Sequence, residues 1–546
     1  MAPPSTFSSS GSGKNRRGRS SAAGWLTEGG AFLLAAFTLA LALVAAGSFV
    51  WVVGHRIAYP YDLEWMEGSM LHHALRVAGG QPIYAAPSID FIPHLYTPLY
   101  PMLVAALGKL CGGVGYLLAR SVSVLSFAGA LAIGVCWARR EGGSLAAGLA
   151  AMALPVAAFA DTGGFYDLVR CDSLQLLLTV AGAALAWYGR GSHRLMALAA
   201  LTLVAAFFAK QTAAPFIVAI GGALLLTRRP AVLTFAGVGI ASFALIAYAL
   251  NRSSGGWFWT YIFQLHQSHA FFTRRAWVET PALLLRLTGT GLLLVPWALL
   301  SQGLGRSPGL RRGPGLLFLG WLGLTGLFAA CLAFGTQWAH TNALIPGLFF
   351  PAIAMGAAAG RLLHRAAPQP AAGATPTSGR PRLQTSAQRH GRALRHGLVW
   401  LLLGLSLLPR VYALRPQTHI PTAADRQAGD AVVERLRTAP GDVLIPFHPF
   451  YAHLAGKPVF LHRMGVWDVR GTAAGPVHGL SAAFVQRRFS RIIFDDKVEA
   501  TWGDWPEVLQ NYRIVERIAG PRVVEGARTV PALVLEPMVA IDRELQ

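Results

Sequence analysis

The sequence predicts a polytopic α-helical membrane protein with outward juxtamembrane helices and a C-terminal extracytoplasmic α/β domain. Of its 546 residues, 53% are hydrophobic and only 13% are charged, whereas about a quarter of the residues of a soluble protein are charged. The apolar residues gather into long runs, and most of the formal charge of +22 lies in the short segments between them. A nucleic-acid-binding protein would collect its basic residues on one face of a soluble domain, so we expect no nucleic acid partner.

Eleven apolar runs approach the roughly 20 residues that a membrane-spanning helix needs. Several runs are only 15 to 17 residues long, so about ten to thirteen spans fit the sequence. The runs lie near residues 31–53, 114–137, 144–160, 173–189, 195–209, 213–227, 231–250, 281–300, 314–334, 342–360 and 397–413. The first run lacks a small-residue cleavage site, so we expect it to remain as an anchor.

The positions of arginine and lysine predict the orientation of these spans. With a cytoplasmic N-terminus, the inward segments carry 20 basic and two acidic residues, as the positive-inside rule requires. The first loop, 54–113, then faces outward, and an odd number of spans exports everything after Ala413. We therefore expect a disordered basic cytoplasmic tail (1–28), a membrane domain (29–413) with a flexible cytoplasmic linker (361–396), and an extracytoplasmic domain (414–546).

The extracytoplasmic domain has the charge balance of a soluble module, with 16 basic and 15 acidic residues. Apolar runs that begin at Asp442, at Arg491 and within 529–537 predict strands, and residues 423–438 predict a helix. The domain contains neither a GxGxxG nor a GxSxG motif. We therefore expect it to cover or bind and not to catalyse.

The first outward loop places three carboxylates within six positions, directly after the first span: Asp62, Glu64 and Glu67. Acidic residues at a membrane surface are costly to desolvate and can mark a functional site, although a solvated loop would also tolerate them. Residues 65–77 predict an amphipathic helix along the outer membrane surface. On that helix Glu67 is a solvated or supporting residue, whereas Asp62 and Glu64 precede the first turn, where the helix N-terminus stabilises negative charge.

The loop between the third and fourth spans is short, outward and rich in charge. It contributes Asp167, Arg170 and Asp172. Two acidic loops on one face could together hold a divalent cation or orient an acceptor hydroxyl. The alternative is that Arg170 simply forms a salt bridge with one of its acidic neighbours.

Polar residues also occur at the outward ends of other spans. Arg120 and Lys210 suit the binding of a lipid phosphate, and the alternative is that they snorkel to the membrane interface. His340 and Asn342 lie in the outward turn before the tenth span. We expect these four residues to face the same compartment as the acidic loops.

Three motifs of the first loop carry a family resemblance. They are the D-x-E of Asp62 to Glu64, the G-x-P-x-Y of Gly80 to Tyr84 and the Y-x-P-L-Y of Tyr96 to Tyr100. With the two acidic loops and the C-terminal domain, they resemble the GT-C fold glycosyltransferases that use polyprenyl-phosphate sugars, of the protein O-mannosyltransferase and lipid A aminoarabinose transferase type. The chain lacks the D-E pair and the H-P-P-L-type segment of the O-mannosyltransferases, so the acceptor class does not carry over.

The resemblance implies a function and a set of roles. A first-loop carboxylate would be the general base, with Asp62 favoured by the order of the motif and Glu64 by its spacing to the glycines, and basic residues would hold the lipid phosphate. The enzyme would be an inverting glycosyltransferase of the bacterial inner membrane that moves a sugar from a polyprenyl phosphate to a glycan, lipid or protein acceptor. The candidate substrate-binding residues are Glu67, Tyr96, Arg120, Asp167, Arg170, Asp172, Lys210, His340 and Asn342.

Two other classes of protein remain as alternatives. A transporter or flippase of envelope lipids or glycans would place its charges at mid-membrane on broken, repeated helices, and the sequence shows no such repeat. A scaffold for envelope assembly would need none of the carboxylates. No cofactor is predicted beyond the divalent cation considered for the acidic loops.

Overall fold

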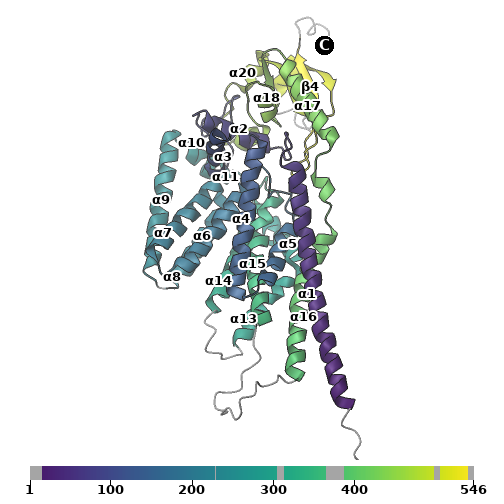
Figure 1. Cartoon of the computed structure of the whole chain (residues 1–546). Helices are drawn as coiled ribbons and strands as arrows, with labels where there is room; N and C mark the ends of the chain where they lie inside the picture. Colours follow the sequence, from purple (N-terminus) through teal and green to yellow (C-terminus); the bar gives the residue numbers. More distant parts are fainter. Residues whose placement is uncertain (1–14, 228, 304–312, 365–385, 497–504, 539–546) are drawn as a thin grey trace, which may run out of the picture.

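A computed structural model of the chain describes residues 15–227, 229–303, 313–364, 386–496 and 505–538. These residues form an elongated helical bundle that carries short helices and a small sheet at one end (Figure 1). Residues 1–14 of the predicted tail and residues 365–385 of the predicted linker lie outside the described residues. The described parts of both segments, 15–28, 361–364 and 386–396, are helical and not disordered or flexible as predicted. Seven of the described helices are long and apolar enough to cross a membrane.

All eleven predicted spans coincide with helices of the bundle. These are α1 (Asn15–Arg56), α4 (Tyr116–Gly142), α5 (Leu145–Ala157), α6 (Asp172–Gly189), α7 (His193–Ala209), α8 (Ala214–Leu225), α9 (Ala231–Ser253), α12 (Thr280–Thr288) with α13 (Leu294–Gly303), α14 (Gly313–Gly335), α15 (Ile345–His364) and α16 (Ser386–Tyr412). The run at 281–300 is divided by a 3-10 turn, η4 (Gly289–Leu293), which Gly289 enters with a φ of +63°.

Short segments join these helices. They are η1 (Gln211–Ala213), α10 (Trp257–Trp259), η2 (Thr260–Gln264), α11 (Leu265–Gln267), η3 (Arg275–Glu279), η5 (Thr341–Leu344) and η6 (Pro416–His419).

The helix α15 forms the centre of the bundle. The apolar window of α15 is 94% buried, whereas those of α1 and α9 are 22% and 17% buried. Small residues allow close packing around α15, because a Cβ atom added to Gly142 of α4 would lie 2.5 Å from the carbonyl oxygen of Ala357. The exposed apolar surfaces of α1 and α9 are those expected of helices that face lipid.

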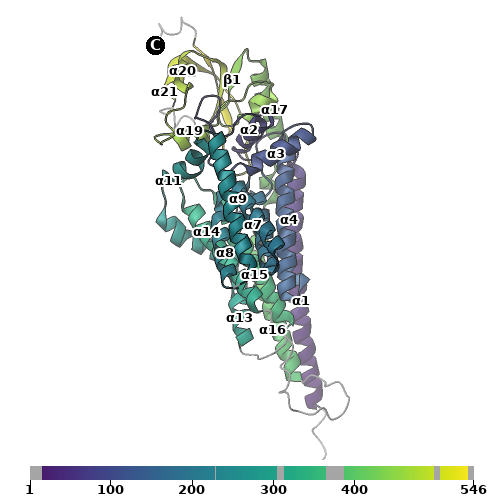
Figure 2. The same cartoon turned by 90° about the vertical axis from the view of Figure 1, so that its left-hand side faces the viewer.

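Two short helices, α2 (Glu67–Ala78) and α3 (Leu99–Leu110), lie where the bundle meets the sheet-containing module (Figure 1). The extent of α2 agrees with the predicted helix at 65–77. Residues 67–74 are all buried, so the polar side of this helix is covered as well as its apolar side. At 12 residues, α3 is shorter than a membrane span. Figure 2 shows the same arrangement from the side, with α2 and α3 between α4 and the module.

The C-terminal module contains a mixed four-stranded sheet in the order β1-β2-β4-β3. Its strands are β1 (Asp442–Leu444), β2 (Phe489–Asp495), β3 (Tyr512–Arg517) and β4 (Pro531–Pro537), and its helices are α17 (Ala423–Thr438), α18 (Phe450–Leu454), α19 (Arg463–Val469), α20 (Leu480–Val485) and α21 (Pro506–Asn511). The pair β1 and β2 is parallel, and β4 is antiparallel to both β2 and β3.

The predicted α/β character of this module is confirmed, with one strand missed. The three predicted strands correspond to β1, β2 and β4, and the predicted helix corresponds to α17. The helix α17 begins with a capping box formed by Thr422 and Asp425. The strand β3 escaped prediction because only its first residue is buried, so its sequence lacks the alternation of a half-buried strand.

Candidate functional site

The three first-loop carboxylates lie buried between the helical bundle and the C-terminal module. Asp62, Glu64 and Glu67 are 1%, 2% and 0% exposed, so the solvated-loop alternative is wrong. The segment that carries Asp62 and Glu64 is a non-helical stretch between the end of α1 and the start of α2. Each carboxylate has different partners, so the three groups differ in what they can do chemically.

Glu64 faces a buried arginine. Its Oε2 atom lies 3.4 Å from Nη1 of Arg170 and accepts a hydrogen bond of 3.3 Å from the backbone N–H of Met66. Nη2 of Arg170 donates a hydrogen bond of 2.8 Å to the hydroxyl of Tyr96. The other carboxylate oxygen of Glu64 accepts no hydrogen bond from the described residues. Burial raises the pKa of Glu64 to about 7, although Arg170 opposes that shift.

A second carboxylate continues this chain of charges. Oδ2 of Asp172 lies 3.9 Å from Nε of Arg170. Oδ1 of Asp172 accepts hydrogen bonds of 2.6 Å from Nζ of Lys210 and 2.9 Å from Nδ2 of Asn342. Among the described residues, Nε of Arg170 and Oδ2 of Asp172 are buried without a hydrogen-bond partner.

We call this set the Glu64 cluster: Glu64, Tyr96, Arg170, Asp172, Lys210 and Asn342. The sequence nominated all six, and the fold brings them together from the first loop, the loop before α6, the turn after α7 and η5. The cluster contains two carboxylates and two cations. Its unpaired buried atoms are the feature that a bound anion or hydroxyl would satisfy.

Asp62 belongs to a separate chain of hydrogen bonds. Its Oδ1 accepts from the hydroxyl of Tyr116 at 2.7 Å, and its Oδ2 accepts from Nδ1 of His448 at 2.8 Å. Nε2 of His448 lies 3.3 Å from Oδ2 of Asp495. Burial alone would lower the pKa of His448, but Asp495 and Asp62 outweigh it and raise that pKa to about 10. Both oxygens of Asp62 are thus already engaged.

Sequence reasoning did not find His448 or Asp495. The contact between His448 and Asp62 spans 386 residues of sequence, and that between His448 and Asp495 spans 47. No local spacing reveals such pairings. The only local signal is that His448 follows a predicted strand closely, in the segment that begins at Asp442, and that Asp495 ends another strand. Polar residues at the ends of neighbouring parallel strands lie at one edge of a sheet.

Glu67 and Arg120 form an internal ion pair, 2.7 Å apart, in which both side chains are fully buried. Glu67 also accepts hydrogen bonds from the backbone N–H groups of Leu63 and Val169. The guanidinium of Arg120 donates to the carbonyls of Tyr59 and Tyr61 as well. These partners account for the donors and acceptors of both side chains, so the pair fastens the first loop to α4. Of the two roles expected for Glu67, solvated or supporting, its burial excludes the first and its partners fit the second.

Asp167 pairs with Arg56 at the end of α1, and the same guanidinium also binds Glu525 of the C-terminal module. Arg56 is 0% exposed and was not nominated from the sequence. His340 packs at the edge of the Glu64 cluster, with its ring 5.3 Å from that of Phe165, and the guanidinium of Arg170 lies over the same phenyl ring. Asp167 thus belongs to a separate ion pair, whereas His340 borders the six residues without a hydrogen bond to them among the described residues.

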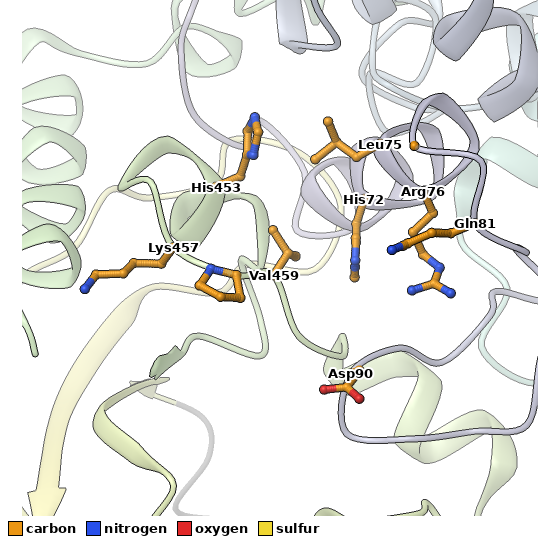
Figure 3. A pocket seen from close by; sticks show the side chains of 10 residues that line it. His72, Leu75, Arg76, Gln81, Asp90, His453, Lys457 and Val459 are labelled. Atoms are coloured by element: carbon orange, nitrogen blue, oxygen red, sulfur yellow. The ribbon is translucent and has the colours of Figure 1, made fainter. Parts of the chain in front are cut away.

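A groove of about 380 Å³ lies elsewhere, between α2 and the chain after α18. Figure 3 shows His72 and Arg76 on the α2 side of this groove, and His453 and Lys457 on the other side. Arg76 donates to the carbonyl of Pro82 and Lys457 to that of Ala439, so the fold already uses both cations. None of the Glu64 cluster lines this groove.

The described residues contain no group of three or more His, Cys, Asp or Glu side chains placed to hold a metal ion. The acidic groups that were considered for a divalent cation instead pair with arginine, lysine or histidine in this part of the chain. We therefore assign no residue to a metal.

Comparison with known proteins gives a fold and no closer relationship. No family model and no curated protein matches the chain. The chain is similar to the apo structure of ArnT from Cupriavidus metallidurans, with a TM-score of 0.51 and 12% identity over 91% of this chain and 96% of that chain.

Two further structures resemble the chain less closely by TM-score. ArnT from the same organism bound to undecaprenyl phosphate gives a TM-score of 0.48 and 14% identity over 92% of this chain and 97% of that chain. The third structure is the oligosaccharyltransferase AglB from Archaeoglobus fulgidus in complex with an inhibitory peptide and a dolichol-phosphate. It gives a TM-score of 0.48 and 11% identity over 88% of this chain and 72% of that chain. At such identities the likeness concerns architecture, and the described chain has the GT-C fold that the sequence predicted.

Proposed function

We propose that the protein is a membrane glycosyltransferase that moves a sugar from a polyprenyl-phosphate donor to an acceptor hydroxyl at the outward face. The observation that carries this proposal is the Glu64 cluster, in which a carboxylate and two cations meet at one end of the bundle. The first-loop motifs, which resemble those of polyprenyl-phosphate-sugar-dependent enzymes, support the lipid-linked donor. The GT-C fold is compatible with this reaction.

Glu64 is the general base in this proposal. It has a carboxylate oxygen without a partner among the described residues, and its pKa of about 7 suits proton transfer near neutral pH. Asp62, in contrast, accepts hydrogen bonds at both oxygens and forms an ion pair with His448. A base must have a free lone pair for the incoming proton, so the geometry favours Glu64.

The reaction follows from this assignment. Glu64 takes the proton of the acceptor hydroxyl while that oxygen attacks the anomeric carbon of the sugar. The bond between that carbon and the phosphate oxygen breaks on the opposite face, so the configuration inverts and the polyprenyl phosphate leaves with the electron pair.

Arg170 and Lys210 would bind the leaving phosphate. Preorganised cations stabilise the charge that develops on a leaving group, and they act more strongly where water is excluded. The side chains of Arg170 and Lys210 are 5% and 12% exposed, and both currently have Asp172 as a counterion. A phosphate would take up the free Nε–H of Arg170, and Asn342 would keep Asp172 in place.

The remaining parts of the proposal concern location and partners. The protein would be a multi-pass component of a bacterial inner membrane, with a cytoplasmic N-terminus and an extracytoplasmic C-terminal module, and its acceptor would be a glycan, lipid or protein. Position also argues against a transporter, because the Glu64 cluster lies at one end of the bundle beside the module and not at its middle.

The test uses the full chain in lipid nanodiscs with a panel of labelled polyprenyl-phosphate sugars and an envelope extract as acceptor. We expect Glu64→Gln to lower the transfer rate at least about 100-fold, as is typical for the loss of a general base. Lys210→Met should raise the KM for the donor more than it lowers kcat. Asp161→Asn is the matched control, because Asp161 pairs with Arg410 outside the cluster. Transfer at the wild-type rate by Glu64→Gln would rule out the proposed base.

A further inference from the structure

The C-terminal module contacts every residue of the segment Tyr61–Trp65, which carries Glu64. Asp430 accepts a hydrogen bond of 2.5 Å from the Tyr61 hydroxyl, and Tyr451 and His448 bind Asp62. The backbone N–H groups of Val524 and Glu525 donate to the Leu63 carbonyl at 3.1 and 2.9 Å. Gly526 packs on Glu64, and Nε2 of His462 lies 3.2 Å from the Trp65 carbonyl oxygen. The segment Tyr61–Trp65 of the first loop is therefore positioned by the module at each of its five residues.

Among the contacts that the module makes with Tyr61–Trp65, the one between His448 and Asp62 is an ion pair. The side chains of His448, Asp62 and Asp495 are each 0% exposed. An imidazolium between two carboxylates donates from both ring nitrogens and so fixes the distance between the module sheet and the first loop. Its orientation is constrained further by Tyr451 of α18, whose ring stacks on it with centroids 5.2 Å apart.

Glu64 itself is weakly anchored. Its two polar contacts, to Arg170 and to the N–H of Met66, are long at 3.4 and 3.3 Å. The module backbone also lies close to Glu64, because a Cβ atom added to Gly526 would lie 2.7 Å from Cγ of Glu64. The position of Glu64, and the exclusion of water from it, therefore depend on the contact between the module and Asp62.

We infer that His448 is a positioning residue of the active site: by pairing with Asp62 it holds the first loop so that Glu64, two residues further on, faces Arg170. This inference uses the proposed function only to identify Glu64 as the base. It gives the C-terminal module a part in catalysis without a reacting group, and it assigns Asp62 to the support of the loop.

The consequence for Glu64 is specific. Loss of the charge on His448 leaves Asp62 buried without its cation, so the segment moves away from the module and water reaches Glu64. Hydration returns the pKa of Glu64 toward the ordinary value of 4.5. A purely structural role for His448 would lower the amount of folded enzyme and leave the pH profile of the remaining enzyme unchanged.

The test compares His448→Ala and His448→Gln with the wild-type chain in nanodiscs. The matched control is His453→Ala, which removes an exposed histidine five residues away on α18. Hydrogen–deuterium exchange of peptides covering residues 60–66 reports the loop without any substrate, and the pH dependence of kcat and of KM for the donor reports the base. Glutamine keeps one hydrogen-bond donor without the charge, so it should be intermediate.

We expect His448→Ala to increase exchange in residues 60–66 at least about tenfold, to lower kcat with a smaller change in KM, and to shift the rising limb of the pH profile by at least one unit toward lower pH. His453→Ala should match the wild type in each measurement.

Unchanged exchange in residues 60–66 of a folded His448→Ala or His448→Gln protein would overturn the inference. If the wild type transfers no sugar, the proposed function fails while the exchange measurement still decides the role of His448. If neither variant folds, Asp495→Asn, which leaves His448 in place, must show the increased exchange.

Discussion

Glu64 and Asp62 stand two residues apart, yet their surroundings give them different chemistry. Asp62 has a cation at one oxygen and a tyrosine hydroxyl at the other. Glu64 has one long contact to Arg170 and an unoccupied oxygen. The difference arises from their partners, because His448 of the module faces Asp62, whereas Arg170, from the loop before α6, faces Glu64.

The pKa of Glu64 sets an expected pH dependence. A general base acts in its deprotonated form, so kcat/KM should be low below pH 6, rise through an apparent pKa near 7 and then reach a plateau. The measurement is the initial rate of sugar transfer from pH 5 to pH 9 with donor below KM. A profile that is already flat at pH 5 would exclude a base with this pKa.

The sequence nominated the members of the Glu64 cluster but could not choose between them and their neighbours. Lys210 and Asn342 were recognised as polar residues at outward span ends, and the fold brings them to Asp172. Arg120 was nominated on the same grounds, but its donors are directed to the backbone of the first loop. Which way a side chain points depends on partners that are distant in sequence, as His448 shows for Asp62.

At the scale of elements, α2 illustrates how a second layer changes the meaning of an amphipathic pattern. Its amphipathic pattern predicted a helix along the outer membrane surface, but its polar side is packed against other parts of the chain: Nε2 of His73 accepts from the backbone N–H of His94, and Phe91 packs on His72. The helix is retained because Glu67 at its first turn pairs with Arg120 of α4. The helix positions were predictable from periodicity, whereas this burial was not, because it depends on how the rest of the first loop and α4 pack against the helix.

The buried pair of Glu67 and Arg120 should be costly to break from one side. We expect Glu67→Gln to destabilise the fold by about 3–5 kcal/mol, because Arg120 stays charged and buried. Thermal unfolding of the detergent-solubilised protein, followed by intrinsic fluorescence, measures the change. The control is Glu434→Gln, whose exposed pair with Arg437 should contribute about 0.5 kcal/mol or less. Equal effects of the two substitutions would contradict the structural role of Glu67.

At the scale of the whole molecule, one end of the bundle carries the module, α2, α3 and the Glu64 cluster together (Figure 1). The number of apolar runs and the GT-C architecture could be predicted from composition, run length and three short motifs. The docking of the module on the first loop could not, because each of its contacts joins residues that are hundreds of positions apart.

The predicted orientation can be checked by labelling. In a background in which the four native cysteines are replaced by serine, Val515→Cys, at a position 44% exposed on β3, should react with a membrane-impermeant maleimide in spheroplasts. Ser9→Cys in the N-terminal tail should react only after the membrane is permeabilised. Labelling of both positions in intact spheroplasts would contradict the positive-inside orientation.

The pairing of Arg56 with Glu525 has a consequence for how the protein is made. The two residues are 469 positions apart, and at a synthesis rate of about 5–20 residues per second roughly 20 to 90 seconds separate them. During that interval the first helix has already emerged, with a guanidinium at its end whose final partner does not yet exist. The contact between the end of α1 and the C-terminal module can therefore form only after residue 525 has been synthesised.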